Sequence, residues 1–132
     1  MNGIVVASLA VDGSGRVLQA ALKVHSALGP GLLESAYEAC LCIELRENGI
    51  EVERQVQLPI IYGGQAIEAA YRLDLLVQKH IVVEVKAVAS ILPIHEAQLI
   101  TYLRLSGYPV GLLLNFQVAR MRDGMKRFVN SR

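Results

Sequence analysis

Residues 74–86 constrain the fold of this chain more than any other stretch, because they place charged groups inside two strongly apolar segments. They read Asp-Leu-Leu-Val-Gln-Lys-His-Ile-Val-Val-Glu-Val-Lys, with a short polar break in the middle. Such runs around a polar break are typical of two strands joined by a turn. Ionised groups in buried strands are costly unless they are paired or bind a metal. The segment therefore predicts a hairpin whose acids need a positive partner.

The register of this hairpin decides which charges meet. A turn centred on Lys79 pairs Val77 with Ile81 and sets Asp74 directly opposite Glu84. Facing residues on paired strands project from the same side of the sheet. Two like charges opposite one another are destabilising unless a positive charge lies between them. A divalent cation held by both carboxylates would supply that charge.

Lys86 adds a second positive charge to the same place. It follows Glu84 by two residues and therefore shares its side of the strand. In a purely structural alternative, Lys86 or Arg72 neutralises the acids and no ion is bound. Spacing alone does not decide between a structural ion network and a functional site, because both perturb buried charges.

Composition limits the class of protein. The 132 residues suit one domain, residues 1–132, and a hydrophobic fraction of 53% argues against disorder. No apolar run reaches the roughly 18 residues needed to cross a membrane. Residues 3–11 also lack the basic segment that precedes a secretory signal. We therefore expect a cytoplasmic protein without a membrane partner, in which Cys40 and Cys42 stay reduced. A net charge of +1 means that a nucleic-acid partner needs a local basic cluster or a metal.

Periodicity and turn residues predict one α/β (α+β) domain with a central mixed four-stranded sheet flanked by helices. Residues 1–15 are ambiguous, although Ile4 could begin a strand. Gly63 and Gly64 predict a tight hairpin turn between the first two strands of the meander. The predicted order is a helix at 16–28, a helix at 33–48, strands at 52–61, 65–77 and 81–88, a helix at 93–105, a strand at 110–116 and a closing hairpin at 120–129.

Two predicted helices carry further polar candidates. Glu34 lies near the start of the second helix, where the helix dipole favours a carboxylate, and Tyr37 shares its face. In the bland reading these are a helix-end charge and a core aromatic. On the third helix, Gln98 and Tyr102 form a polar stripe with His95 one turn earlier. Solvent exposure is the simplest explanation of such a stripe, above all for His95, whereas the neutral amide of Gln98 can hydrogen-bond a phosphate oxygen or a metal-bound water.

The C-terminal segment is the only basic cluster in the sequence, and Asp123 alone opposes it. Most such runs are solvated faces. The alternative is contact with a phosphate backbone. The candidate residues for phosphate contacts are Arg120, Arg122, Lys126 and Arg127.

Several ordered motifs together resemble the GxxExxY proteins. The naming signature Gly-x-x-Glu-x-x-Tyr matches Gly31 to Tyr37, and further similar stretches span residues 17–118. That family belongs to the PD-(D/E)XK nuclease-like superfamily, with a restriction-endonuclease-like core of helix, three-stranded meander, helix and strand. The matching stretches are Val24–Pro30, Tyr71–Val77, Val83–Ala87, Ala97–Leu99, Tyr102–Leu103 and Leu113–Phe116.

The resemblance implies a role for each matching residue. Asp74 corresponds to the acid of the first half-motif, and Glu84 with Lys86 corresponds to the second. Glu34 matches the helix carboxylate that often completes the metal site, and Gln98 matches the helix glutamine placed beside the lysine. One departure is Leu73, which stands where many members have proline. The accessory residues would be Tyr37, Tyr102 and His95.

The resulting hypothesis is a Mg²⁺- or Mn²⁺-dependent nuclease that hydrolyses DNA or RNA. Asp74, Glu84 and the Val85 carbonyl would hold the metal, with Glu34 completing the site. Lys86 would stabilise developing charge and Gln98 would fix a phosphate oxygen or the nucleophile. The alternative is a catalytically silent module that binds nucleic acid or a protein partner. A homo-oligomer with a structural role also remains open.

Overall fold

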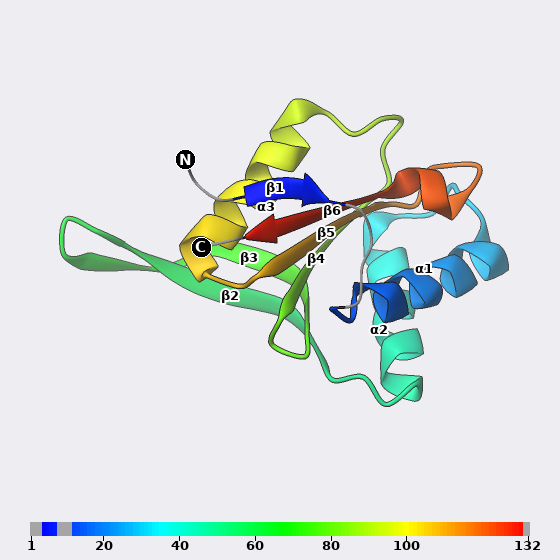
Figure 1. Ribbon diagram of the computed structural model, residues 1–132, viewed down its shortest axis with the longest axis horizontal. Helices are drawn as coiled ribbons and strands as arrows, with labels where there is room; N and C mark the ends of the chain where they lie inside the picture. The colour runs from blue at the N-terminus through cyan, green and yellow to red at the C-terminus, as the bar shows by residue number, and fades with distance from the viewer. Residues whose placement is uncertain (1–3, 8–11, 131–132) are drawn as a thin grey trace.

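The computed structural model describes residues 4–7 and 12–130 (Figure 1). A six-stranded mixed sheet forms its centre, in the order β1-β6-β5-β4-β3-β2. The helices are α1 (Ser14–Leu28), α2 (Glu34–Glu47) and α3 (Pro93–Ser106), with a 3-10 turn η1 (Met121–Gly124). The strands are β1 (Ile4–Ala7), β2 (Val52–Tyr62), β3 (Gln65–Val77), β4 (Ile81–Lys86), β5 (Val110–Asn115) and β6 (Met125–Asn130).

The predicted order of two helices, three strands, a helix and a strand is confirmed. β4 and β5 run parallel, and the other strand pairs are antiparallel. β6 and β1 extend the four central strands beyond β5. Within the ambiguous N-terminal segment, residues 4–7 form β1, whereas residues 1–3 and 8–11 lie outside the described residues. None of the described helices is both long and apolar enough to span a membrane.

The closing hairpin predicted over 120–129 is wrong. The chain instead makes the 3-10 turn η1, and β6 pairs antiparallel with β5. The reason is a close backbone approach at Gly124, where an added Cβ would lie only 2.1 Å from the Asn115 carbonyl oxygen. The segment therefore folds back onto the end of β5 rather than onto itself.

Two apolar cores hold the helices on opposite faces of the sheet. The larger core packs α1 and α2 against one face, and the smaller core packs α3 against the other. α3 approaches the sheet closely at Gly111, where a Cβ would lie 2.9 Å from Leu103 and 3.0 Å from Leu99. β5 is buried along its whole length, as its run of aliphatic residues predicts.

The β2–β3 hairpin turns at Gly63 and Gly64, whose φ values of 59° and 79° are those that a tight hairpin turn requires. Its outer part, residues 61–70, is exposed and projects beyond the rest of the sheet (Figure 1). The inner part of β3 pairs with both β2 and β4. The hairpin thus has a buried base, which contains Asp74, and an exposed arm.

Candidate active site

The predicted register of the β3–β4 hairpin is confirmed, because Val77 pairs with Ile81. The paired ladder runs as far as Leu75 and Val83, and Asp74 and Glu84 come next on their strands. There the two acids bond backbone groups across the gap. The Asp74 N–H donates to Glu84 Oε2 at 3.1 Å, and the Val85 N–H donates to Asp74 Oδ2 at 2.8 Å. Beyond the last paired residues of β3 and β4, hydrogen bonds from backbone N–H groups to side-chain carboxylates therefore replace the backbone–backbone hydrogen bonds.

Asp74 lies where β3 changes faces. Leu75 belongs to the core under α1 and α2, whereas Leu73 belongs to the core under α3. Residues two apart on a regular strand share one face, so the strand must turn over at Asp74. The neighbouring position on β2 is Gln55, whose φ of 56° is in the left-handed region. A non-glycine residue in this conformation costs about 1–3 kcal/mol and is most common at functional sites.

The electrostatics of the acid pair are unfavourable without a cation. The Glu84 side chain is only 4% exposed. Burial, and then the charge of Asp74, raise the pKa of Glu84 from 4.5 to about 8. Burial is also the main cause that raises the pKa of Asp74, and Lys86 opposes both shifts. One nearby ammonium group is therefore too weak to offset the burial of two facing carboxylates.

Lys86 links the end of β4, where the acids lie, to α3 through a hydrogen bond. Glu84 and Lys86 share the strand face of Val82, which packs in the core under α3. Lys86 Nζ donates to Gln98 Oε1 at 3.5 Å, and Gln98 Nε2 donates to the Tyr102 hydroxyl at 3.0 Å. A continuous polar row therefore runs from the second acid to the middle of α3.

Glu34 reaches the same end of β4 from the other face. Its Oε2 accepts the Ala87 N–H at 3.0 Å, so the start of α2 is fixed directly beyond Lys86. Glu34 is exposed, in contrast to the two strand acids. The structure therefore places all five predicted catalytic residues around the end of β4: Asp74, Glu84, Lys86, Glu34 and Gln98.

Glu38 is an acid near this site that the sequence analysis did not select. It is 5% exposed, and its negative charge contributes to the raised pKa values of Asp74 and Glu84. Arg54 binds it at 3.0 Å, and the Gln55 amide donates to both of its carboxylate oxygens at 2.9 and 2.7 Å. The available signal was its position four residues after Glu34, on the same side of α2. Gln55, the strand residue in the left-handed conformation, is thus held by its hydrogen bonds to the paired Glu38.

Two predicted accessory residues lie in structural roles. Tyr37 is fully buried, stacks on Phe116 with ring centroids 4.6 Å apart, and donates its hydroxyl hydrogen to the Gly29 carbonyl at 2.5 Å. It anchors the loop before α2. His95 Nδ1 accepts the Leu92 N–H at 3.0 Å and caps the start of α3. Only Tyr102 among the accessory residues contacts the polar row.

The four basic candidates at the C-terminal end do not form one open cationic surface. Arg127 is buried and pairs with Asp12, and Lys126 pairs with Glu96 at 2.6 Å. Arg120 lies 3.4 Å from Asp123, and Arg122 is exposed on η1. Internal ion pairs therefore absorb most of the charge that suggested phosphate contacts.

The donor atoms of the acid pair suit a hard divalent cation. Each carboxylate uses one oxygen for a backbone N–H, so Asp74 Oδ1 and Glu84 Oε1 are available as ligands. Mg²⁺ commonly binds through one or two carboxylates and keeps several waters. Across the described side chains, no three His, Cys, Asp or Glu residues form a cluster that encloses an ion. The two strand acids therefore offer a two-carboxylate site, and Glu34 does not form a compact three-acid cluster with them.

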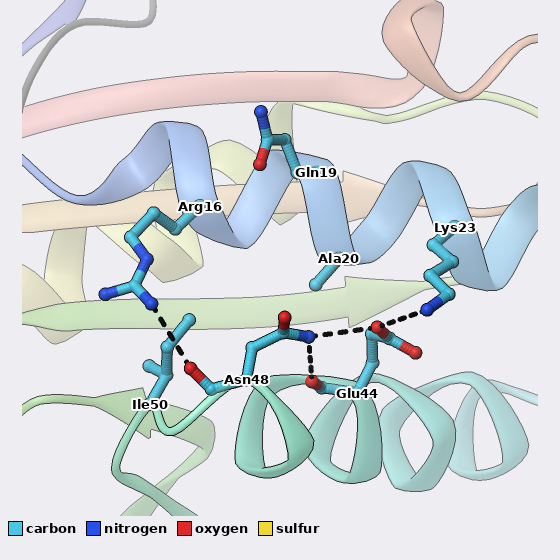
Figure 2. Close-up of a pocket in the computed structure, with 7 residues that line it drawn as sticks. All are labelled: Arg16, Gln19, Ala20, Lys23, Glu44, Asn48 and Ile50. Carbon is cyan, nitrogen blue, oxygen red and sulfur yellow. Dashed lines mark hydrogen bonds and ion pairs between the residues drawn. The ribbon is translucent and has the colours of Figure 1, made fainter.

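A separate pocket of about 300 Å³ lies between α1 and α2 (Figure 2). Its charges have partners within the pocket, because Lys23 lies 3.1 Å from Glu44 and Arg16 donates to the Asn48 carbonyl at 3.3 Å. No predicted site residue lines it. The lining residues are Arg16, Gln19, Ala20, Lys23, Glu44, Asn48 and Ile50.

Facing strand acids with a lysine two residues later, on a mixed sheet between helices, define a nuclease-like domain. A model of the PD-(D/E)XK nuclease superfamily matches residues 12–128, and the chain belongs to that superfamily. The chain is also similar to a solved structure titled "Crystal structure of SSO0001", with 21% identity and a TM-score of 0.49. That match covers 89% of this chain and 77% of the other. No curated protein gives a significant match.

Proposed function

We propose that this protein is a divalent-metal-dependent nuclease that hydrolyses phosphodiester bonds in DNA or RNA. One observation carries the proposal: the buried Glu84 and the partly buried Asp74 face each other with Lys86 as the nearby cation, and their pKa values are raised. Such a pair is stabilised by a bound cation. Superfamily membership supports the same reaction class. The match of residues 31–37 to the Gly-x-x-Glu-x-x-Tyr signature supports a GxxExxY-type member.

Asp74, Glu84 and the Val85 carbonyl would hold Mg²⁺ or Mn²⁺, and Glu34 would complete the acidic side from α2. When bound, the ion neutralises the acids, polarises the phosphate and lowers the pKa of water. Lys86 contributes its ammonium group to the charge that develops on the phosphate. The side chain of Gln98 orients Lys86 and fixes a phosphate oxygen or the nucleophile.

The arrangement favours an enzyme over a silent binding module. A module needs no lysine held beside two acids, yet Lys86 is held there by Gln98, which Tyr102 in turn orients. Such a row fixes the ammonium group without neutralising it, because neither the Gln98 amide nor the Tyr102 phenol carries a negative charge. The two free cysteines fit the cytoplasm, which we keep as the proposed compartment.

Cleavage of a panel of DNA and RNA substrates with Mg²⁺ and Mn²⁺ tests the proposal. We expect cleavage that needs the metal, and a loss of roughly 100-fold or more in Lys86→Ala. Lys23→Ala is the matched control, because Lys23 is an exposed lysine on α1. Cleavage by Lys86→Ala at the wild-type rate, or no cleavage of any substrate by the wild type, would contradict the proposed enzyme.

A further inference from the structure

We infer that Tyr71 and Tyr102 form a stacking platform for an unpaired base next to the scissile phosphate, so that the substrate is single-stranded nucleic acid. The inference deepens the proposed function and rests on it. Its chemistry is the stacking of a nucleobase on aromatic rings, which tolerates every base because each has a π-face. DNA and RNA share that chemistry.

The two rings lie directly beside the proposed catalytic groups. Tyr71 precedes Asp74 by three residues on β3, and Tyr102 hydrogen-bonds Gln98, the partner of Lys86. The ring centroids of Tyr71 and Tyr102 are 5.0 Å apart, and their planes are tilted by 33°. A phosphate held near Lys86 would therefore place its own nucleotide within reach of the ring pair.

The exposure of these rings distinguishes them from the core aromatics. The Tyr37–Phe116 pair is fully buried and nearly parallel, with an interplanar angle of 10°. Tyr71 and Tyr102 are only partly buried at the edge of the smaller core. Each thus has apolar contacts on the protein side and stays partly accessible to solvent, which a stacking surface needs.

The distribution of aromatic residues supports the same surface. All seven tyrosine and phenylalanine residues of the chain lie in its described part. Tyr108 is a third partly buried ring. Burial is the main cause that raises the pKa of Tyr71, and the phenol of Tyr108 is the next cause. Tyr62 is exposed at the tip of the hairpin arm, and the other three rings are buried. Every half-exposed ring therefore packs at the edge of the smaller core, and Tyr102 interacts there with both strand acids.

Base pairing would block this contact, which is why the surface selects single strands. In a duplex each base is stacked on both faces and paired at its edge, so stacking on protein requires it to leave the helix. An unpaired segment pays no such cost. The exposed Arg72, next to Tyr71, is within electrostatic range of Tyr102 and offers a phosphate contact beside the rings.

Binding without metal tests the inference separately from catalysis. The chain has no tryptophan, so its five tyrosines supply the intrinsic fluorescence, and a binding response that is lost in Tyr71→Leu or Tyr102→Leu reports on the platform. The probes are oligothymidylate, oligouridylate, a blunt duplex of equal length, and an oligothymidylate that carries abasic sites, all in EDTA. We expect the wild type to bind both intact single strands at least tenfold tighter than the duplex or the abasic strand.

Tyr71→Leu and Tyr102→Leu sharpen the assignment, because leucine keeps apolar packing and removes the ring. Each should lose roughly tenfold in affinity for the intact strands and change little for the abasic strand, whereas Tyr102→Phe should keep the ring contact. Equal wild-type affinity for intact and abasic strands would overturn the platform, even if the variants fail to fold. Metal-dependent cleavage together with binding that does not depend on the bases would refute the stacking platform, while the proposed nuclease function would still stand. Base-dependent binding without any cleavage would refute the nuclease alone.

Discussion

Two sites in this domain differ in how the charge of their acids is compensated. At the start of α1, Asp12 accepts hydrogen bonds from Ser14 and pairs with buried Arg127 of β6. At the end of the β3–β4 ladder, Asp74 and Glu84 face each other, with Lys86 nearby as the cation. Burial tends to raise the pKa of the acids at both sites. At Asp12, however, hydrogen bonds from Ser14 and Arg127 and the positive charge of Arg127 lower the pKa to about 2.

The difference separates a structural acid from a functional one. A protein that needs a buried charge only for its fold supplies the opposite charge itself, as Asp12 does for the buried Arg127. Glu38 follows the same rule, because Arg54 and Gln55 neutralise and hydrogen-bond it. Asp74 and Glu84 break the rule, since burial raises both pKa values, the charge of Asp74 raises that of Glu84 further, and Glu38 adds to both. The missing compensation is what a bound ion would provide.

The largest expected effect is on metal affinity. Asp74→Asn keeps an oxygen for the Val85 N–H but removes one of the two ligand charges. We expect Mn²⁺ affinity, measured by calorimetry, to fall roughly 100-fold. Asp123→Asn is the control, because Asp123 is an exposed acid paired with Arg120 on η1. Unchanged Mn²⁺ affinity of Asp74→Asn would mean that the ion binds elsewhere, and that the Asp74–Glu84 pair is not a metal site.

The next effect is a stability that decreases as the pH rises. The folded pKa of Glu84, about 8, lies above its ordinary 4.5, so the folded state binds this proton more tightly than the unfolded state. The resulting stability is fully present below about pH 4.5 and is lost as the pH rises through about 8. In EDTA we expect the free energy of unfolding to fall by roughly 1–3 kcal/mol over this range.

Glu84→Gln is the matching variant, because it keeps the oxygen that accepts the Asp74 N–H and removes the second charge. Its unfolding free energy, measured by thermal or urea denaturation, should lose most of this pH dependence and exceed that of the wild type at pH 9. A wild-type profile that is flat from pH 5 to 9 in EDTA would show that the acids are already compensated.

The sequence predicted the placement of the candidate site residues better than the surfaces around them. The short polar break centred on Lys79 predicted the register that brings Asp74 opposite Glu84, because a turn at that position pairs Val77 with Ile81. Glycine pairs and helix stops located the remaining elements to within a few residues. The closing hairpin failed because the close packing of Gly124 on Asn115 is a tertiary contact that no local pattern records.

The less predictable features all depend on contacts between distant segments. The change of face at Asp74 needs Gln55, on a different strand, in a left-handed conformation. Arg127 read as part of a basic cluster, yet Asp12, which binds it, lies at the other end of the sequence. Net charge and local runs cannot reveal such pairing, whereas a turn between two apolar runs is a local property of the sequence and can be recognised directly.

The smallest effect concerns the structural acid and has the opposite sign. Asp12 has a folded pKa of about 2, below its ordinary 3.8, so its contribution to stability is present above about pH 4 and is lost as the pH falls towards 2. Because Asp12 is partly exposed, we expect a loss of only about 1 kcal/mol. Denaturant unfolding of the wild type and of Asp12→Asn from pH 5 to 2 measures it. The variant should lose less stability on acidification, while Glu84→Gln should keep the wild-type slope there. An acid slope that Asp12→Asn leaves unchanged would mean that other carboxylates carry it, and the contrast between the two sites would then rest on Glu84 alone.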